Sequence, residues 1–76
     1  MAELLEYLAR QLVDEPDAVR VERVDEADTV VLRLHVAQED LGKVIGRQGR
    51  IARALRTIVR AGSAREQRRV QLEIVD

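Results

Sequence analysis

Apolar residues recur along the chain with two spacings, which predict where helices and strands lie. From Glu3 to Val13 they recur every three or four residues, as on one face of a helix, and Pro16 stops that helix. From Val30 to Val36 apolar and polar positions alternate strictly, as in a strand with one buried face. The expected inward residues are Leu5, Leu8, Ala9 and Leu12 in the helix and Val30, Leu32, Leu34 and Val36 in the strand.

The strand that precedes this one is less regular. The stretch from Val19 to Val24 is rich in β-branched side chains, but Arg23 falls on the same face as Val21. This defect predicts an edge strand or a bulge, followed by a turn at residues 25–28. A last strand, from about Arg68 to Val75, alternates again and directs Val70, Leu72 and Ile74 inward.

Two helices are predicted between the regular strand and the last one. Acidic residues open a short helix at residues 39–44, and Gly46 can end it in a left-handed conformation. A longer helix from about Gln48 to Ala61 follows, with Gly62 in the place of a C-terminal capping glycine. The apolar stripe of the longer helix consists of Ile51, Ala52, Leu55, Ile58 and Val59.

The order of these elements is αββααβ. Strands joined by a short turn pair antiparallel, whereas a strand reached through two helices can lie parallel to its neighbour. Because each element has a single apolar side, three helices should cover one face of a mixed three-stranded sheet. The sequence therefore predicts an α+β fold, a two-layer sandwich, in one domain of 76 residues.

Composition narrows the classes of function. The chain contains no cysteine, so it has no disulfide, thiolate nucleophile or cysteine metal site, and we expect no cofactor or metal. His35 has no evident nucleophile or ligand partner, and the clustered carboxylates flank turns, so we expect no enzyme activity. Because no leader peptide or membrane-spanning apolar run is recognisable, we expect a cytoplasmic protein.

The net charge of −1 conceals a division along the chain. Residues 1–40 contain 4 Lys/Arg and 11 Asp/Glu, for −7, whereas residues 41–76 contain 9 and 3, for +6. A polyanion responds to such a local patch rather than to the total charge. On the longer helix Arg50, Arg53, Arg56 and Arg60 share one face, and we assign Arg56 and Arg60, the farthest from the glycines, to an ordinary solvated surface.

The run from Val44 to Ile51 is the strongest motif in the chain. Gly46 and Gly49 bracket Arg47 and Gln48 immediately before a basic helix. Glycine admits positive φ and close backbone approach, and the first turn of a helix attracts anions. The loop therefore suits a phosphate, although its spacing matches neither the dinucleotide fingerprint nor the P-loop.

This motif, extended back to Asp40, resembles the GXXG signature of KH domains, and the element order resembles their type II arrangement. Size and motif are similar to the small bacterial stand-alone KH proteins of the KhpA (YlqC-type) family. The resemblance implies a helix-and-strand extension at residues 1–27 and a KH core at residues 28–76. It also implies a single-stranded RNA-binding protein that holds about four nucleotides.

In such proteins the glycine loop clamps the sugar–phosphate backbone and an adjacent apolar groove receives the bases. Val44 and Ile45, with part of the second strand, either line this groove or belong to the core, and the sequence leaves both alternatives open. Only Tyr7 is aromatic, so no aromatic platform for base stacking is expected. The implied RNA-binding residues are Lys43, Val44, Ile45, Gly46, Arg47, Gln48, Gly49, Arg50 and Arg53.

The resemblance also implies partners. Members of this family self-associate and act with a larger KhpB (Jag-type) RNA-binding partner as RNA chaperones or post-transcriptional regulators in cell-envelope and cell-shape homeostasis. We therefore expect a homodimer, with a candidate interface at Ala54, Thr57, Ile58, Val59 and Ala61. The alternatives are a dimerisation or docking module with little RNA binding of its own and, with less support, a DNA-binding helix-turn-helix.

Overall fold

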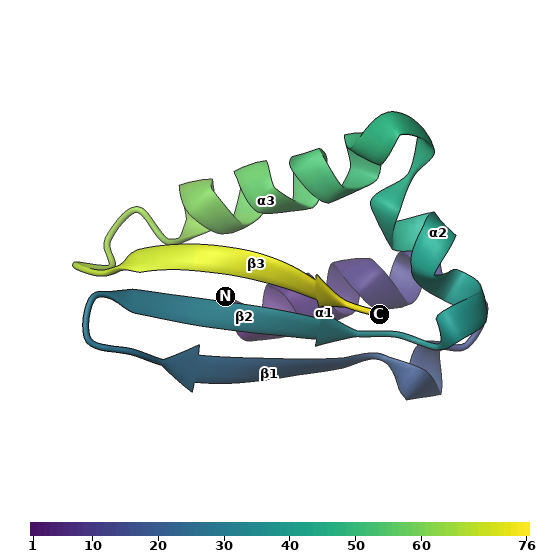
Figure 1. The fold of residues 1–76 in the computed structure, drawn as a ribbon, viewed down its shortest axis with the longest axis horizontal. Helices are drawn as coiled ribbons and strands as arrows, with labels where there is room; N and C mark the ends of the chain where they lie inside the picture. Colours follow the sequence, from purple (N-terminus) through teal and green to yellow (C-terminus); the bar gives the residue numbers. More distant parts are fainter.

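The computed structural model describes residues 1–76 and confirms the predicted α+β sandwich (Figure 1). Strands β1 (Arg20–Asp25), β2 (Thr29–His35) and β3 (Arg69–Val75) form one sheet in the order β1-β2-β3. Strand β1 pairs antiparallel with β2, and β3 pairs parallel with β2. The parallel pairing follows from the crossover through two helices, because that connection returns the chain to the same end of the sheet.

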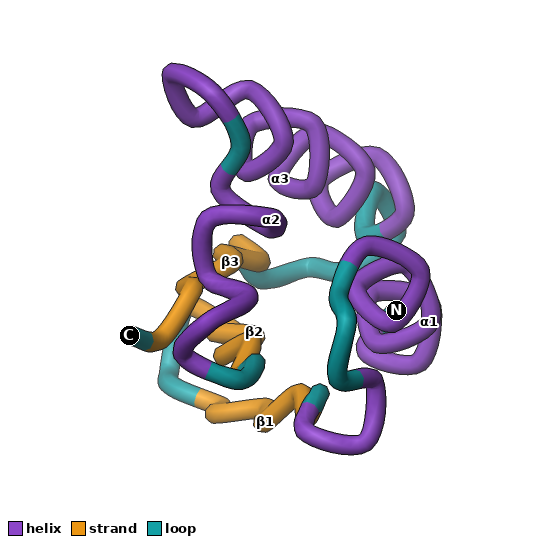
Figure 2. The backbone as a smooth tube through the Cα atoms, turned by 90° about the vertical axis from the view of Figure 1, so that its right-hand side faces the viewer, coloured by secondary structure: helices purple, strands orange, loops and turns teal.

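Three α-helices lie on one side of this sheet (Figure 2). Helix α1 (Ala2–Leu12) packs against β1, and helix α3 (Arg50–Gly62) packs against β3. The short helix α2 (Leu41–Ile45) contacts both of them. Single 3₁₀ turns at Pro16–Ala18, Gln38–Asp40 and Arg47–Gly49 connect the elements.

The core forms where β2 meets the helices. As the alternation predicts, Val30, Leu32 and Leu34 are almost completely buried. The sheet register places Leu32 beside Leu72 of β3, which continues the buried face across the parallel pair. The buried core cluster consists of Leu5, Ala9, Val19, Val30, Leu32, Leu34, Val44, Leu55, Val59 and Leu72.

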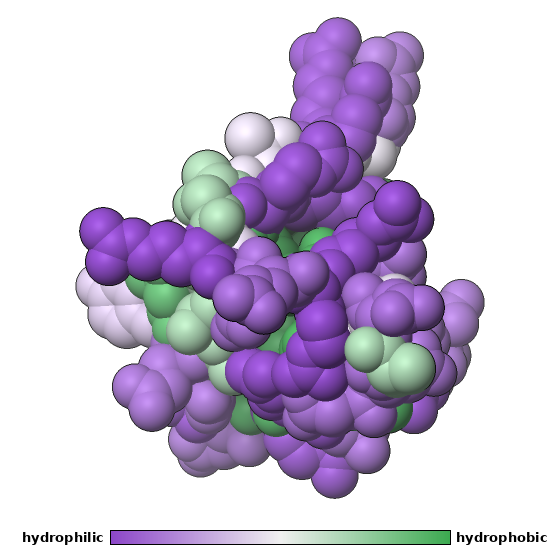
Figure 3. All heavy atoms as spheres, turned by 90° about the vertical axis from the view of Figure 1, so that its left-hand side faces the viewer, coloured by the Kyte–Doolittle hydropathy of each residue, from purple (hydrophilic) through white to green (hydrophobic).

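The other face of the sheet has no helix over it. Arg33, in the middle of β2, lies between carboxylates of both neighbouring strands: its Nη1 is 3.7 Å from Glu22 Oε1 and its Nε is 3.5 Å from Glu73 Oε1. Figure 3 shows the end of the molecule with the β1–β2 turn and the α3–β3 loop, where most of the surface is hydrophilic. The sheet therefore buries one face only, as the alternating pattern predicts.

Several local predictions change in the structure. Strand β1 is the expected edge strand, and its unbroken register with β2 leaves no bulge. Leu12 and Ile58, predicted to face the core, are more than one-third exposed because they border a groove between α1 and α3. Gly62 ends α3 without a positive φ, so it is not a left-handed cap; a methyl group on it would lie 1.7 Å from Met1 Cε.

Candidate functional site

The glycine loop between α2 and α3 has an unusual backbone. Gly46 has φ 77° and ψ 169°, Gln48 has φ 58° and ψ 23°, and Gly49 has φ 74° and ψ 16°. Gly46 thus ends α2 with positive φ, as predicted, but with an extended ψ rather than a left-handed helical one. This region is accessible essentially only to glycine.

Packing under the loop also requires glycine at position 46. A Cβ there would lie 2.7 Å from Ile51 Cγ1 and 2.9 Å from the Ile51 backbone nitrogen. At position 49 a Cβ would meet nothing within 4 Å. Gly46 therefore lets the loop lie directly against the first turn of α3.

Side chains from α3 hold the loop from the other side. Arg53 Nη2 donates a hydrogen bond to the carbonyl oxygen of Gln48 at 2.8 Å, and Arg50 Nη2 donates to Gln48 Oε1 at 3.2 Å. Arg47 is exposed, and no hydrogen bond or ion pair within the chain engages its guanidinium group. The loop thus presents one free guanidinium, with two more bound only to the loop itself.

Lys43, predicted to extend the phosphate contact, has other partners. Its Nζ lies 3.1 Å from Asp40 Oδ1 and 3.1 Å from Asp14 Oδ2. These hydrogen bonds, first to Asp40 and then to Asp14, raise the pKa of Lys43. Its charge is therefore balanced within the protein, and its contact with the N-terminal half could not be deduced from sequence because residues 14 and 43 are distant along the chain.

The two apolar residues before the loop lie in different environments. Val44 is fully buried in the core, whereas Ile45 is 40% exposed. The inward side chains of β2 are also buried, so the second strand contributes no apolar surface to a groove. Of the residues for which sequence left both alternatives open, only Ile45 is available to a ligand through its side chain.

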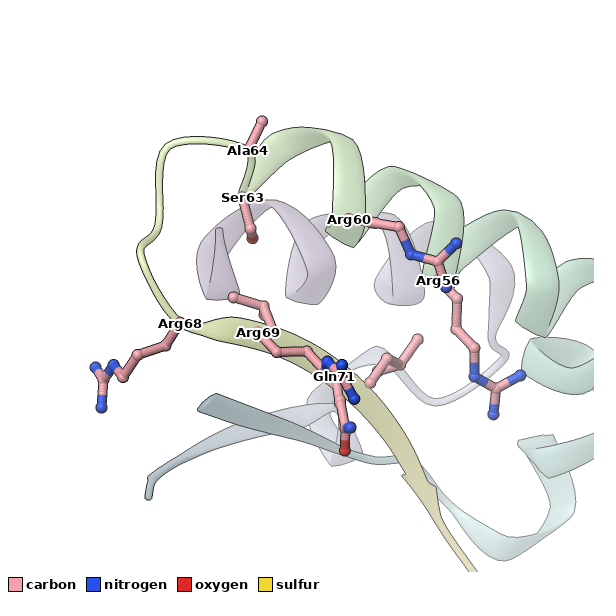
Figure 4. A pocket seen from close by; sticks show the side chains of 9 residues that line it. Arg56, Arg60, Ser63, Ala64, Arg68, Arg69 and Gln71 are labelled. Carbon is pink, nitrogen blue, oxygen red and sulfur yellow. The ribbon is translucent and has the colours of Figure 1, made fainter. Parts of the chain in front are cut away.

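A groove of about 660 Å³ lies between α3 and β3 (Figure 4). Arg56 extends from α3 toward β3 and Arg60 runs along α3, whereas the side chain of Gln71 lies on the side of β3 away from α3. Arg68 points away from the groove and pairs with Asp25 Oδ1 at 2.7 Å. The lining residues are Arg56, Arg60, Ser63, Ala64, Arg68, Arg69, Val70, Gln71 and Leu72.

Arg56 and Arg60 are exposed, as predicted for a solvated helix face, and they also border this groove. The parallel crossover returns β3 to the side of α3, and so brings the start of the last strand opposite these arginines. Arg69 and Gln71 are exposed, as the alternation of the last strand predicts.

A second, apolar groove of about 340 Å³ lies between α1 and α3. Of the candidate dimer residues, Ala54 and Ile58 line it, whereas Thr57 and Ala61 are exposed beside it. Val59 is 1% exposed and belongs to the core, so its side chain cannot form an interface in the folded chain. The groove is lined by Leu8, Gln11, Leu12, Arg50, Ile51, Ala54, Leu55 and Ile58.

No group of three or more His, Cys, Asp or Glu side chains is placed to hold a metal ion. None of the helices has the length and hydrophobicity needed to cross a membrane.

Comparison with known proteins gives a consistent result. The family described as "KhpA/KhpB, KH domain" matches residues 2–74. A relative from Clostridium acetobutylicum named "RNA-binding protein KhpA" is 51% identical over 75 residues, which cover 99% of this chain and all of the relative. A protein of the same name from Treponema pallidum is 51% identical, and the match covers 97% of this chain and 92% of the relative. Another from Aquifex aeolicus is 49% identical, and the match covers 100% of this chain and 96% of the relative. No solved structure gives a significant match.

Proposed function

The chain belongs to the KhpA/KhpB family of KH domains, and from this premise we propose that it binds single-stranded RNA as a non-catalytic protein. The observation that carries the proposal is the backbone of residues 46–49, where three positive φ angles expose the chain beside the unpaired Arg47. Such a loop can approach a sugar–phosphate backbone closely. In KH domains it clamps about four nucleotides.

The proposed site extends from the loop along α3. Arg47, Arg50 and Arg53 neutralise phosphates, while Gly46 and Gly49 permit close approach and Gln48 adds a neutral hydrogen-bonding group. Ile45 offers exposed apolar surface next to the loop. Lys43 and Val44 support the loop rather than contact RNA directly. Lys43 is paired with Asp40 and Asp14, and Val44 is buried.

A binding experiment tests the loop directly. Fluorescence anisotropy with a labelled single-stranded RNA is expected to show salt-sensitive binding by the wild type and its loss in Arg47→Asp/Gln48→Asp. The control Arg20→Asp/Gln38→Asp makes the same charge change at exposed positions of β1 and the 38–40 turn. Equal binding by the wild type and the loop variant, with both folded by circular dichroism, would contradict the proposed site.

The salt dependence of RNA binding distinguishes a free cationic side chain, Arg47, from a paired one, Lys43. Each phosphate contact on a single strand contributes about 0.7 to the slope of log K against log salt concentration. Arg47→Gln is expected to reduce the slope by about that amount, and Lys43→Gln to leave it nearly unchanged because Asp40 and Asp14 already engage this ammonium group. Equal slope changes in both variants would place Lys43 in contact with phosphate.

The apolar groove between α1 and α3 supports a second function, homodimerisation. Its walls include Leu12, Ala54 and Ile58, and an apolar surface gains from burial against another copy. We expect sedimentation to show a dimer for the wild type and a monomer for Ile58→Asp, with the exposed loop variant Arg65→Asp unchanged. A monomeric wild type at all accessible concentrations argues against the dimer.

The cellular role rests on resemblance to the family. We propose that the protein works in the cytoplasm as an RNA chaperone or post-transcriptional regulator, together with a larger KhpB (Jag-type) partner, in cell-envelope and cell-shape homeostasis. A deletion strain is expected to change shape, and the wild-type gene to restore it. Restoration by the Arg47→Asp/Gln48→Asp variant would favour the docking module over RNA binding.

A further inference from the structure

Gln48 is the only residue of the chain other than glycine that has a positive φ. Its φ of 58° and ψ of 23° place it in the left-handed region, where a residue with a Cβ is strained. Gly46 and Gly49 adopt their positive φ angles without that cost. A strained backbone persists only where its surroundings hold it, so the conformation of Gln48 depends on contacts from outside the loop.

Arg53, in the first turn of α3, provides such a contact. Its Nη2 donates a hydrogen bond of 2.8 Å to the carbonyl oxygen of Gln48, five residues earlier in the chain. Because the donor carries a positive charge, this bond is stronger than one between neutral groups. None of the ion pairs within the chain involves Arg53, so no carboxylate draws its guanidinium group away from the loop.

Arg50 contacts the same residue in a different way. Its Nη2 donates a hydrogen bond of 3.2 Å to Oε1, in the side chain of Gln48. The side chain of a glutamine turns about its own χ angles, so a bond at its end does not fix the backbone angle φ. Of these two arginines, only Arg53 therefore restrains the backbone of Gln48.

We propose that Arg53 is a positioning residue, which holds Gln48 in its left-handed conformation and so shapes the loop before RNA binds. The inference rests on the proposed RNA-binding function and adds a role for Arg53 beyond its charge. A guanidinium group has five N–H donors, so the bond to Gln48 leaves others for a phosphate. A loop that is already ordered loses less conformational freedom on binding, which favours affinity.

Nuclear magnetic resonance of the free protein tests the backbone role without RNA. In a residue with positive φ the amide and α protons lie unusually close, which gives a strong nuclear Overhauser effect between them. We expect this signal at Gln48 in the wild type and a weaker one in Arg53→Gln, whose shorter side chain cannot reach the carbonyl oxygen. The matched control Arg50→Gln makes the same charge change and should keep the signal.

RNA affinity gives a second readout, in which the lost charge must be separated from the lost hydrogen bond. Asparagine tolerates the left-handed region better than glutamine, so Gln48→Asn should make the loop less dependent on Arg53. Anisotropy titrations compare the wild type, both single variants and Arg53→Gln/Gln48→Asn, and the lost charge cancels between the two backgrounds. We expect Arg53→Gln to weaken binding about threefold more in the wild-type background than in the Gln48→Asn background.

The outcomes separate this inference from the proposed function. An unchanged Gln48 signal in Arg53→Gln, an equal weakening in Arg50→Gln, or equal affinity losses in the two backgrounds overturns the positioning role of Arg53. If RNA binding by the wild type is still lost in Arg47→Asp/Gln48→Asp, the proposed function stands in each of these cases. If the wild type binds no RNA, both the proposed function and this inference are overturned.

Discussion

At the scale of single residues, the glycines of this chain have different structural roles. Gly46 combines a positive φ with a close approach to Ile51, Gly49 has a left-handed conformation in open space, and Gly42 lies inside α2 with nothing within 4 Å of an added Cβ. The sequence around Gly42, Gly46 and Gly49 does not by itself distinguish these three roles. Their backbone angles and neighbours determine which substitution is tolerated.

The three glycine-to-alanine variants are expected to differ in stability. Gly46→Ala should lower the free energy of unfolding by about 2–4 kcal/mol, because strain and a backbone clash act together. Gly49→Ala should cost about 1–2 kcal/mol for the left-handed conformation alone. Gly42→Ala should stabilise α2 by about 0.5–1 kcal/mol. Urea denaturation measures the series, and equal effects of Gly46→Ala and Gly42→Ala would contradict the loop geometry.

At the scale of elements, α2 depends on its surroundings. Its five residues are too few for a stable isolated helix, so neighbouring contacts must fix it. Asp40, which precedes the helix and is 1% exposed, accepts a hydrogen bond from Lys43 Nζ at 3.1 Å and one from the Glu15 backbone N–H at 3.1 Å. These contacts join the start of α2 to the segment after α1, and so position the glycine loop that follows α2.

This anchor predicts a dependence of stability on pH. Burial raises the pKa of Asp40, but hydrogen bonds from Lys43 and from the backbones of Glu15 and Asp14 outweigh it, and the pKa falls below its ordinary value of 3.8. A carboxyl group whose pKa is lowered in the folded state stabilises the protein at pH values above its ordinary pKa. This contribution is lost as the pH falls through the folded-state pKa. Asp40→Asn should therefore be less stable than the wild type at neutral pH, with a difference that shrinks in acid.

Urea denaturation at neutral pH and at several values below 3.8 measures this difference. The control is Asp17→Asn, an exposed residue without an ion pair, for which we expect a change within about 0.5 kcal/mol at neutral pH. A difference between the wild type and Asp40→Asn that stays constant across the acid range would show that the carboxylate charge is not the stabilising feature.

At the scale of the whole molecule, the core is shared between the N-terminal extension and the segment proposed as the KH core. Leu5, Ala9 and Val19 belong to the buried cluster of ten residues, and all three lie in residues 1–27. Without this segment β2 loses its antiparallel partner, and α1 no longer covers the sheet. A chain this small has little buried surface to lose.

The fragment 28–76 is therefore expected not to fold alone. Circular dichroism should show no cooperative thermal transition for the fragment, whereas residues 1–76 unfold cooperatively. Addition of the separate peptide 1–27 serves as a test of specificity and should restore some helical and strand signal. A cooperative transition in the fragment alone would make residues 28–76 an autonomous unit.

The sequence by itself determined the features that depend on local pattern. Alternation identified the buried face of β2 because side chains of a strand point to opposite sides in turn. Helical spacing, Pro16 and the glycine loop gave the order of elements, and the short turn and the long crossover gave the strand directions. The basic run beside the loop was visible for the same reason, because the charge and spacing of residues can be read directly from the sequence.

Only the tertiary structure decided which distant residues meet. It separated buried Val44 from exposed Ile45, paired Lys43 with Asp14, and brought the start of β3 beside the end of α3 that carries Arg56 and Arg60. Periodicity tells which side of an element is apolar, but not how far its neighbours cover that side or which charge lies across a gap. These outcomes depend on the packing of α1 and α3 on the sheet, because contacts between residues far apart in sequence form only when the chain closes around its core.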